Sequence, residues 1–181
     1  KVNRNIIEAG KKLKIIGRAG VGVDNIDVNS ATEKGIIVVN SPDGNTIAAS
    51  EHTIALMLAI SRNIVPASQS TKEGKWNRDA FTGTELFGKT LGVMGFGRIG
   101  RKVVNIALSI GMKVIVYDPF ANEETVNKAC ALYETSLDNF LKALDYLSIH
   151  IPKTSDTINI INKENINKMK KGAIIINCSR G

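Results

Sequence analysis

Short runs of branched aliphatic residues alternate along this chain with longer segments whose apolar residues recur at helical spacing. Strands that are apolar throughout and separated by helices are typical of parallel sheets covered on both faces. The pattern therefore predicts an α/β architecture with strands buried on both sides. These strands are expected at residues 13–20, 35–40, 90–96, 112–118, 145–152 and 173–177.

Two of the segments between these runs carry clear helix signals. In residues 98–110 the apolar side chains fall on one face, and Gly111 follows as a stop. Residues 135–144 offer Ser136 as an N-cap. The buried positions predicted for the two helices are Ile99, Val103, Ile106, Ala107 and Ile110, and Leu137, Phe140, Leu141 and Leu144.

A third segment, residues 46–64, is apolar nearly all the way round. Such a helix is expected to be buried between domains or in a subunit interface. The Pro-, Gly- and Asn-rich stretch NSPDGN before it indicates a crossover, so we expect one domain at 1–43 and another at 44–181. Residues 70–89 are polar and irregular and carry the only Trp, which predicts a loop or arm.

Composition adds only broad limits. The chain has 181 residues and a net charge of +7, and its longest apolar run, TIALMLAI, is far too short to span a bilayer, so a soluble cytoplasmic protein without membrane contact is expected. The basic residues are scattered, which favours small anionic ligands over nucleic acid. Their one cluster, KMKKG at 168–172, predicts the last turn of a helix before a Gly.

The cysteine content gives no framework for a disulfide or a metal site. Cys130 and Cys178 are far apart, without a CxxC motif or a nearby pair of His residues. We therefore expect two ordinary core thiols and no bound metal.

The stretch LGVMGFGRIG carries the strongest chemical signal. It ends a predicted strand, contains the spacing Gly95-x-Gly97-x-x-Gly100, and opens a predicted helix. Gly95 would allow the tight turn, Gly97 would let the backbone approach a pyrophosphate, and Gly100 would allow the helix to pack closely. Such a motif alone is weak, but here Asp118 ends the next strand at the spacing at which an acid binds the adenosine ribose.

Asp118 also indicates which dinucleotide is bound. Its carboxylate would repel a 2′-phosphate, and the residues that follow it, Pro119 and Phe120, include no Arg to receive one. NAD is therefore predicted over NADP.

A second Gly-rich turn occurs in GRAGVGVDNID at 17–27. The spacing of Gly17, Gly20 and Gly22 does not fit a dinucleotide fingerprint. The backbone N–H groups of such a turn can form a nest for a carboxylate, and a purely structural strand-to-helix turn is an equally good interpretation.

Seven stretches together resemble the D-isomer-specific 2-hydroxyacid dehydrogenases: GRAGVGVDNID, VNSPDGN, SEHTIALMLAISRN, GKWNRDAFTGTEL, GKTLGVMGFGRIG, YDPF and INCSRG. This resemblance implies a doubly wound Rossmann domain that binds NAD, and part of a second, flavodoxin-like substrate domain. The active site is then expected in the cleft between the two domains. Within the family, GRAG and GKWNR favour the branch that oxidises 3-phosphoglycerate for serine biosynthesis.

The resemblance also assigns roles to cofactor-site positions. It places Arg98 and Ile99 on the pyrophosphate and Asp118 on the adenosine ribose. Ile151 and Pro152 are expected on the adenine side. Cys178, Ser179 and Arg180 are expected to face the nicotinamide and the substrate.

Substrate contacts are implied in the same way. Val21 and Gly22 are expected to offer backbone to the substrate carboxylate and the nicotinamide edge. Arg180 is the implied catalytic residue, because a guanidinium can hold a 2-keto acid by two bonds and polarise its carbonyl. Trp76 and Arg78 resemble an arm of a homo-oligomer, at least a dimer, in which Trp76 fills a pocket of a neighbouring subunit and Arg78 approaches the substrate phosphate. Burial of the Trp76 ring within its own chain is the alternative.

The family's general acid, a His with a Glu partner, follows the Arg in sequence and has no counterpart in these 181 residues. Neither His52 nor His150 is expected to replace it. We therefore expect a fragment of a longer enzyme that binds NAD without turnover. A glyoxylate or hydroxypyruvate reductase of the same family, and an NAD-sensing protein of the co-repressor type, remain as alternatives.

Overall fold

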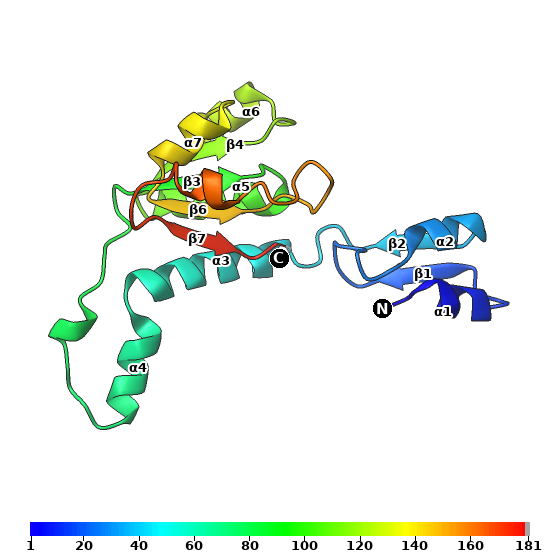
Figure 1. The fold of residues 1–181 in the computed structure, drawn as a ribbon, viewed down its shortest axis with the longest axis horizontal. Coiled ribbons are helices and arrows are strands. Elements are labelled where there is room, and N and C mark those ends of the chain that lie inside the picture. Colours follow the sequence, from blue (N-terminus) through cyan, green and yellow to red (C-terminus); the bar gives the residue numbers. More distant parts are fainter. Residues whose placement is uncertain (180–181) are drawn as a thin grey trace. The chain divides into compact units, whose positions relative to one another are not determined.

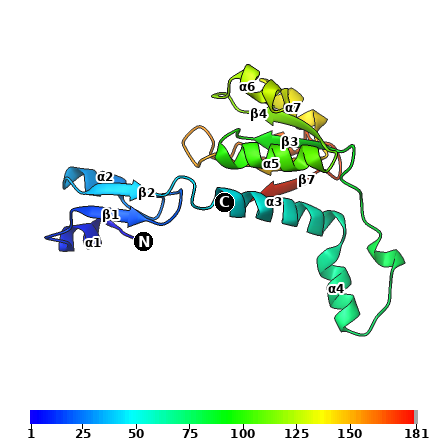
Figure 2. The same cartoon turned by 180° about the vertical axis from the view of Figure 1, so that it is seen from behind.

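The computed structural model describes residues 1–179, and the chain divides into two compact units, Lys1–Thr46 and Ile47–Gly181. Each unit is described by itself (Figures 1 and 2). The assignment of residues 1–43 to a substrate domain stays a prediction.

The first unit is a two-stranded parallel sheet with helices packed on one face. Its core consists of Ile7, Ala31 and Ile36, and the strands contribute Ile16 and Val38 to it. Alternate strand residues on the other face are about half exposed, so the expectation that both faces are covered is wrong for these two strands. The elements are α1 (Arg4–Ala9), β1 (Ile15–Arg18), α2 (Val28–Glu33) and β2 (Ile37–Asn40).

The second unit is built on a five-stranded parallel sheet with the order β5-β4-β3-β6-β7. From β3 the chain adds β4 and then β5 on one side of the sheet. It then returns to add β6 and β7 on the other side of β3, so the strand order changes direction between β3 and β6. In such sheets ligands bind at this switch point, beyond the carboxyl ends of the strands. The strands are β3 (Thr90–Met94), β4 (Lys113–Tyr117), β5 (Leu132–Tyr133), β6 (Tyr146–Ile149) and β7 (Ile174–Asn177).

Helices cover both faces of this sheet, which confirms the doubly wound prediction. One face is packed by α3, α5 and α6 through residues such as Met57, Val103 and Val126. The opposite face is packed by α7, whose Phe140 and C-cap residue Leu144 approach Gly92 of β3 so closely that a Cβ there would clash with both. The helices are α3 (Thr46–Ser61), α5 (Arg98–Ser109), α6 (Glu123–Lys128), α7 (Leu137–Ala143) and α8 (Lys163–Ile166).

The two helices with clear sequence signals form at the predicted places. Gly111 follows α5 with a φ of 80°, and the Ser136 side chain caps α7 by accepting from the N–H of Asn139. The prediction for 168–172 is wrong, because α8 already ends at Ile166. Lys168 and Lys170 instead lie in the turns before β7, where they form ion pairs with Asp138 and Asp145.

The apolar segment 46–64 is not one helix. α3 ends at Ser61, and the left-handed Asn63 (φ 53°) redirects the chain into α4 (Ile64–Lys72), so the predicted arm begins inside a helix. Small polar residues of α3 face the core of the unit, whereas several of its large apolar residues point outward. The inward polar group is Ser50, Thr53 and Ser61, beside the buried Ile54 and Met57, and the exposed group is Ile47, Leu56, Leu58 and Ile60.

The segment from α4 to β3 is hydrogen-bonded to the end of α3 where it returns to the rest of the unit. The N–H of Thr84 donates to the carbonyl of Ser61 over 2.7 Å, and the Asn63 side chain donates to Thr82. Gly83 lies so close to the Ser61 carbonyl that a Cβ there would clash. Between these points run α4, which buries no residue, and the short helix η1 (Asp79–Phe81), away from the sheet in both views (Figures 1 and 2).

Two further expectations are corrected or bounded by the structure. Cys130 is exposed rather than a core thiol, because its left-handed backbone (φ 60°) places it in the turn after α6. Cys178 is partly buried. Within residues 1–179, no helix combines the length and apolarity that crossing a membrane requires.

Candidate cofactor site

The Gly-rich turn joins β3 to α5 at the switch point of the sheet. Gly95 has a φ of 98°, which side chains disfavour, and a Cβ there would lie 2.8 Å from the carbonyl oxygen of His150. A Cβ on Gly100 would overlap the carbonyl oxygen of Gly95. These two glycines are therefore required by the fold itself.

Gly97 differs from both neighbours. It is the N-cap of α5, its φ of −73° is open to any residue, and a Cβ built on it would meet no protein atom within 4 Å. No protein atom therefore demands a glycine at this position. A pyrophosphate over the first turn of α5 would demand one, because the N–H groups there have no acceptor within the helix and must be approached closely.

Asp118 is held against this turn from the end of β4. One carboxylate oxygen accepts from the N–H of Phe96 over 2.7 Å, and the other accepts from the N–H of Phe120 over 2.9 Å. The Tyr133 hydroxyl donates to the Asp118 carbonyl and fixes the backbone. Each carboxylate oxygen can accept a second hydrogen bond, so the acid can also receive ribose hydroxyls. The Gly-rich turn and the acid together fit the adenosine diphosphate half of NAD.

His150 lies on the other side of the switch point, directly after β6. The ring nitrogen Nε2 of His150 is 2.7 Å from the hydroxyl of the fully buried Ser148. The backbone N–H of His150 donates to the carbonyl of Met94 at the end of β3. Burial lowers the pKa of His150 from 6.5 to about 4, so the ring is neutral at physiological pH. His52, in contrast, is exposed on α3.

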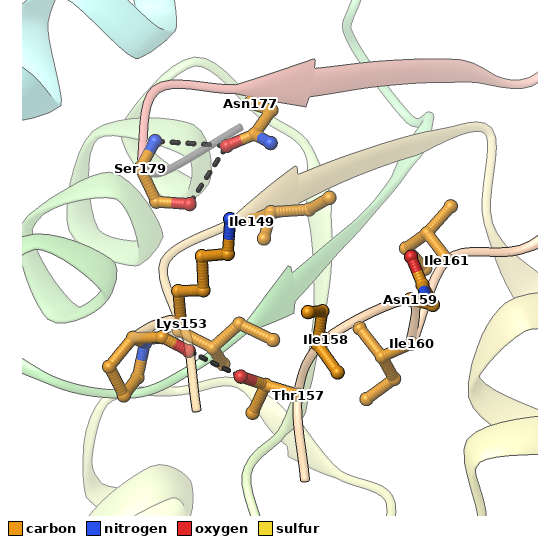
Figure 3. A pocket seen from close by; sticks show the side chains of 11 residues that line it. Ile149, Lys153, Thr157, Ile158, Asn159, Ile160, Ile161, Asn177 and Ser179 are labelled. Carbon is orange, nitrogen blue, oxygen red and sulfur yellow. Dashed lines mark hydrogen bonds between the residues drawn. The ribbon is translucent and has the colours of Figure 1, made fainter. Parts of the chain in front are cut away.

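A cavity of about 380 Å³ opens at the carboxyl ends of β6 and β7 (Figure 3). It brings together Ile151 and Pro152, expected on the adenine side, with Ser179, expected on the nicotinamide side. The Ser179 N–H and hydroxyl both donate to the side-chain oxygen of Asn177, which shapes the chain at the end of β7. Five isoleucines form most of the apolar lining: Ile149, Ile151, Ile158, Ile160 and Ile161.

The second Gly-rich turn, in the first unit, has its carbonyl groups engaged. The Asn40 side chain donates to Val21, and Arg18 donates to Gly22. The N–H groups of Val21 and Gly22 donate to no acceptor among residues 1–179. The N–H donors that a carboxylate nest requires are therefore present in this turn.

The remaining predicted residues are placed as follows. Ile99 lies in the first turn of α5, where its carbonyl accepts from Ser50 of α3, and Arg98 begins the same helix. Arg78 is exposed on the arm, and Trp76 is 82% exposed, so its ring is not buried by its own chain. Arg180 lies outside the described residues.

Comparison with known proteins identifies the group to which this arrangement belongs. Residues 54–181 match the family model described as D-isomer specific 2-hydroxyacid dehydrogenase, NAD binding domain. The chain belongs to this family. The match confirms NAD as the cofactor of the Rossmann domain.

Individual members show how far the likeness extends. The chain is 55% identical over its whole length to a D-3-phosphoglycerate dehydrogenase from Synechocystis, and covers 32% of it. It is 50% identical over its whole length to a hydroxypyruvate reductase from Thermotoga maritima, and covers 58% of that protein. The solved structure of an Aquifex aeolicus D-lactate dehydrogenase with NAD and lactic acid superposes with a TM-score of 0.89 at 36% identity, over all of this chain and 54% of the other. The chain thus spans about a third of the length of the phosphoglycerate dehydrogenases it matches.

Several features of the site were not found from the sequence. The bond between Asp118 and the Phe96 N–H, the Ser148–His150 pair and the position of Lys153 in the cavity all depend on loops meeting across strands. Ser148 could have been recognised as a candidate, because it is the one aliphatic hydroxyl in a run of buried residues.

Proposed function

We propose that this chain is the cofactor-binding core of an NAD-dependent dehydrogenase that oxidises 3-phosphoglycerate to 3-phosphohydroxypyruvate, in the cytoplasm. The observation that carries the cofactor-binding part of the proposal is Gly97, which the fold does not require and a bound pyrophosphate does. The identity to D-3-phosphoglycerate dehydrogenases over the whole chain supports the choice of substrate. The free thiols are typical of a reducing compartment.

Each part of the site has a distinct task in this reaction. The N–H groups of the first turn of α5, at Arg98 and Ile99, bind the pyrophosphate, and Asp118 binds the adenosine ribose. Ile151 and Pro152 form an apolar wall on the adenine side. When bound, NAD supplies a hydride acceptor at the nicotinamide ring.

The substrate is oriented by charge and by backbone donors. The N–H groups of Val21 and Gly22 bind its carboxylate, and Cys178 and Ser179 lie beside the nicotinamide. Arg180 fixes the acid by two bonds and stabilises the developing carbonyl oxygen. Removal of the hydroxyl proton requires a base outside these residues, so the chain alone binds NAD without turnover.

The test is a comparison of substrates on the natural polypeptide that contains this chain. NADH formation should be faster with 3-phosphoglycerate than with glycerate or glycolate at equal concentration. The Arg180→Lys variant should retain NAD binding and lose most of kcat/KM, since an ammonium cannot form the two-pronged contact. Equal rates with the phosphorylated and unphosphorylated acids would contradict the choice of substrate.

A hydroxypyruvate reductase is the second candidate. The observation that favours it is the Thermotoga maritima relative, which is 50% identical over the whole chain. This function predicts rapid NADH oxidation with hydroxypyruvate and little discrimination in favour of a phosphate group. The same substrate panel therefore separates the two functions.

We also propose that the protein is a homo-oligomer, at least a dimer, that associates through α3, α4 and the arm. This surface carries exposed apolar side chains on α3, Val65 on α4 at 72% exposure, and Trp76 on the arm. Exposed apolar groups in such number indicate an interface. A second copy fits, because α3 buries Ile54 and Met57 in the core of its own unit and still leaves four large apolar side chains exposed: Ile47, Leu56, Leu58 and Ile60.

Sedimentation velocity tests this association. Val65→Asp and Trp76→Ala should each shift the protein toward monomer, while Phe120→Ala, at an even more exposed aromatic residue (95%) beyond β4, should leave the distribution unchanged. A wild-type monomer across the micromolar range would contradict the proposal.

A further inference from the structure

The cavity at the ends of β6 and β7 contains a lysine to which the proposed reaction assigns no role. Lys153 follows Pro152 in the loop after β6, and in Figure 3 its side chain extends into the cavity toward Ser179. It forms no hydrogen bond or ion pair with any other residue in the described part of the chain. Its charge is therefore available to a ligand.

The lining around this lysine favours an anion. Among residues 1–179 it includes no Asp or Glu, and its polar members there besides Lys153 are neutral: Thr157, Asn159, Asn177 and Ser179. The floor is formed by isoleucines, which lower the local dielectric and so strengthen the attraction between an ammonium and an anion. The chain as a whole carries a net charge of +7, which adds to the attraction.

The loop that carries Lys153 is held in shape by its own hydroxyls. The Thr157 hydroxyl donates to the Pro152 carbonyl and accepts from the N–H of Thr154. Both bonds flank Lys153, so the base of its side chain is fixed while the ammonium end can adjust. A binding group on a fixed loop loses less conformational entropy when a ligand arrives.

We propose that Lys153 is a specificity-determining residue that binds a phosphate group of a ligand at this edge of the sheet. The proposal rests on the proposed function, because the ligand bound there supplies the phosphate. Two sources share this chemistry, the pyrophosphate of the dinucleotide and the phosphate of the acid substrate. Inorganic phosphate, 3-phosphoglycerate and NADH separate them.

The isoleucine methyl groups of the cavity give a direct readout on the chain itself. In NMR titrations with isoleucine methyl labelling, inorganic phosphate and 3-phosphoglycerate should shift the Ile158 and Ile160 signals and leave Ile37, in the first unit, unchanged. Lys153→Met should weaken this response about fivefold, as expected for the loss of one partly exposed ion pair. Lys153→Arg should retain it. Lys163→Met, which removes one charge from α8 outside the cavity, is the matched control.

Each result has one interpretation. A response to phosphate or 3-phosphoglycerate that depends on Lys153 supports the proposal with the substrate as source, and a Lys153-dependent response to NADH alone supports it with the cofactor as source. Responses equal in wild type and Lys153→Met, or no response to any of the three probes, overturn it. NADH binding that depends on Gly97, together with no Lys153-dependent response to any of the three probes, would overturn this inference and leave the proposed function standing.

Discussion

Gly97 and Gly100 of the β3–α5 turn predict different outcomes for one chemical change, the addition of a methyl group. Gly97→Ala is the most informative, because the structure separates its effect on binding from its effect on folding. The native φ of −73° suits alanine, and the new Cβ would meet no protein atom within 4 Å. The chain should therefore fold as before and lose affinity for NADH.

The two contributions to stability nearly cancel. Restricting the unfolded chain by replacing glycine with alanine stabilises the fold by roughly 0.4–1 kcal/mol. Alanine is a poorer N-cap than glycine by about the same amount, roughly 1 kcal/mol. The melting temperature should therefore change by no more than about 2–4 °C. Forcing a methyl group against a bound pyrophosphate costs about 1–3 kcal/mol, which corresponds to roughly 5- to 150-fold weaker binding.

The assay is a fluorescence titration with NADH, combined with thermal unfolding of the same samples. Gly17→Ala in β1 is the control, because its Cβ would meet only Val39 at an ordinary 3.9 Å. Unchanged NADH affinity in Gly97→Ala would refute the role of this glycine in cofactor approach. A Gly97→Ala protein that fails to fold would refute the claim that the fold leaves this position open.

Three further outcomes follow from the same geometry. Gly100→Ala should lower the free energy of unfolding in urea by about 1–3 kcal/mol, because its Cβ overlaps the Gly95 carbonyl; a stability equal to wild type would contradict the close packing. Asp118→Ala should weaken NADH binding and reduce discrimination against NADPH, measured by parallel titrations, since the acid that repels a 2′-phosphate is gone. His150 is neutral in the fold with a pKa of about 4 against 6.5 unfolded, so the unfolded chain binds the extra proton between these values. Stability should be fully present above pH 6.5 and fall by up to about 3 kcal/mol toward pH 4, and His150→Gln should flatten this slope in urea titrations at each pH.

The elements that could be predicted are those whose signal is local. Runs such as 91–94 and 114–117 are apolar throughout because they are covered on both faces, and Gly111 and Ser136 mark helix ends by their own backbone and side-chain chemistry. β5 has only two residues, too few to show a pattern.

The errors have physical causes that lie far away in sequence. Lys168 and Lys170 were assigned to a helix end, but they lie in turns, where they pair with Asp138 of α7 and with Asp145, the residue before β6. The break at Asn63 is stabilised by Thr82 and Gly83, which return from the arm. These partners are too distant in sequence to be recognised from the residues that flank the lysines or Asn63.

The cofactor site also contains residues that could be predicted from local sequence and features that could not. Gly95, Gly97, Gly100 and Asp118 could be assigned from spacing, because their tasks are set by the dinucleotide and by one strand–turn–helix unit. The meeting of the β6 loop with the end of β7, which creates the cavity and places Lys153 in it, depends on sheet order and could not.

A crystal structure of this chain with NADH tests the central claim most directly. The account predicts the pyrophosphate over Gly97 and the first turn of α5, with the adenosine ribose hydroxyls within hydrogen-bond distance of the Asp118 carboxylate. A dinucleotide bound elsewhere, or bound here with its ribose away from Asp118, would contradict it.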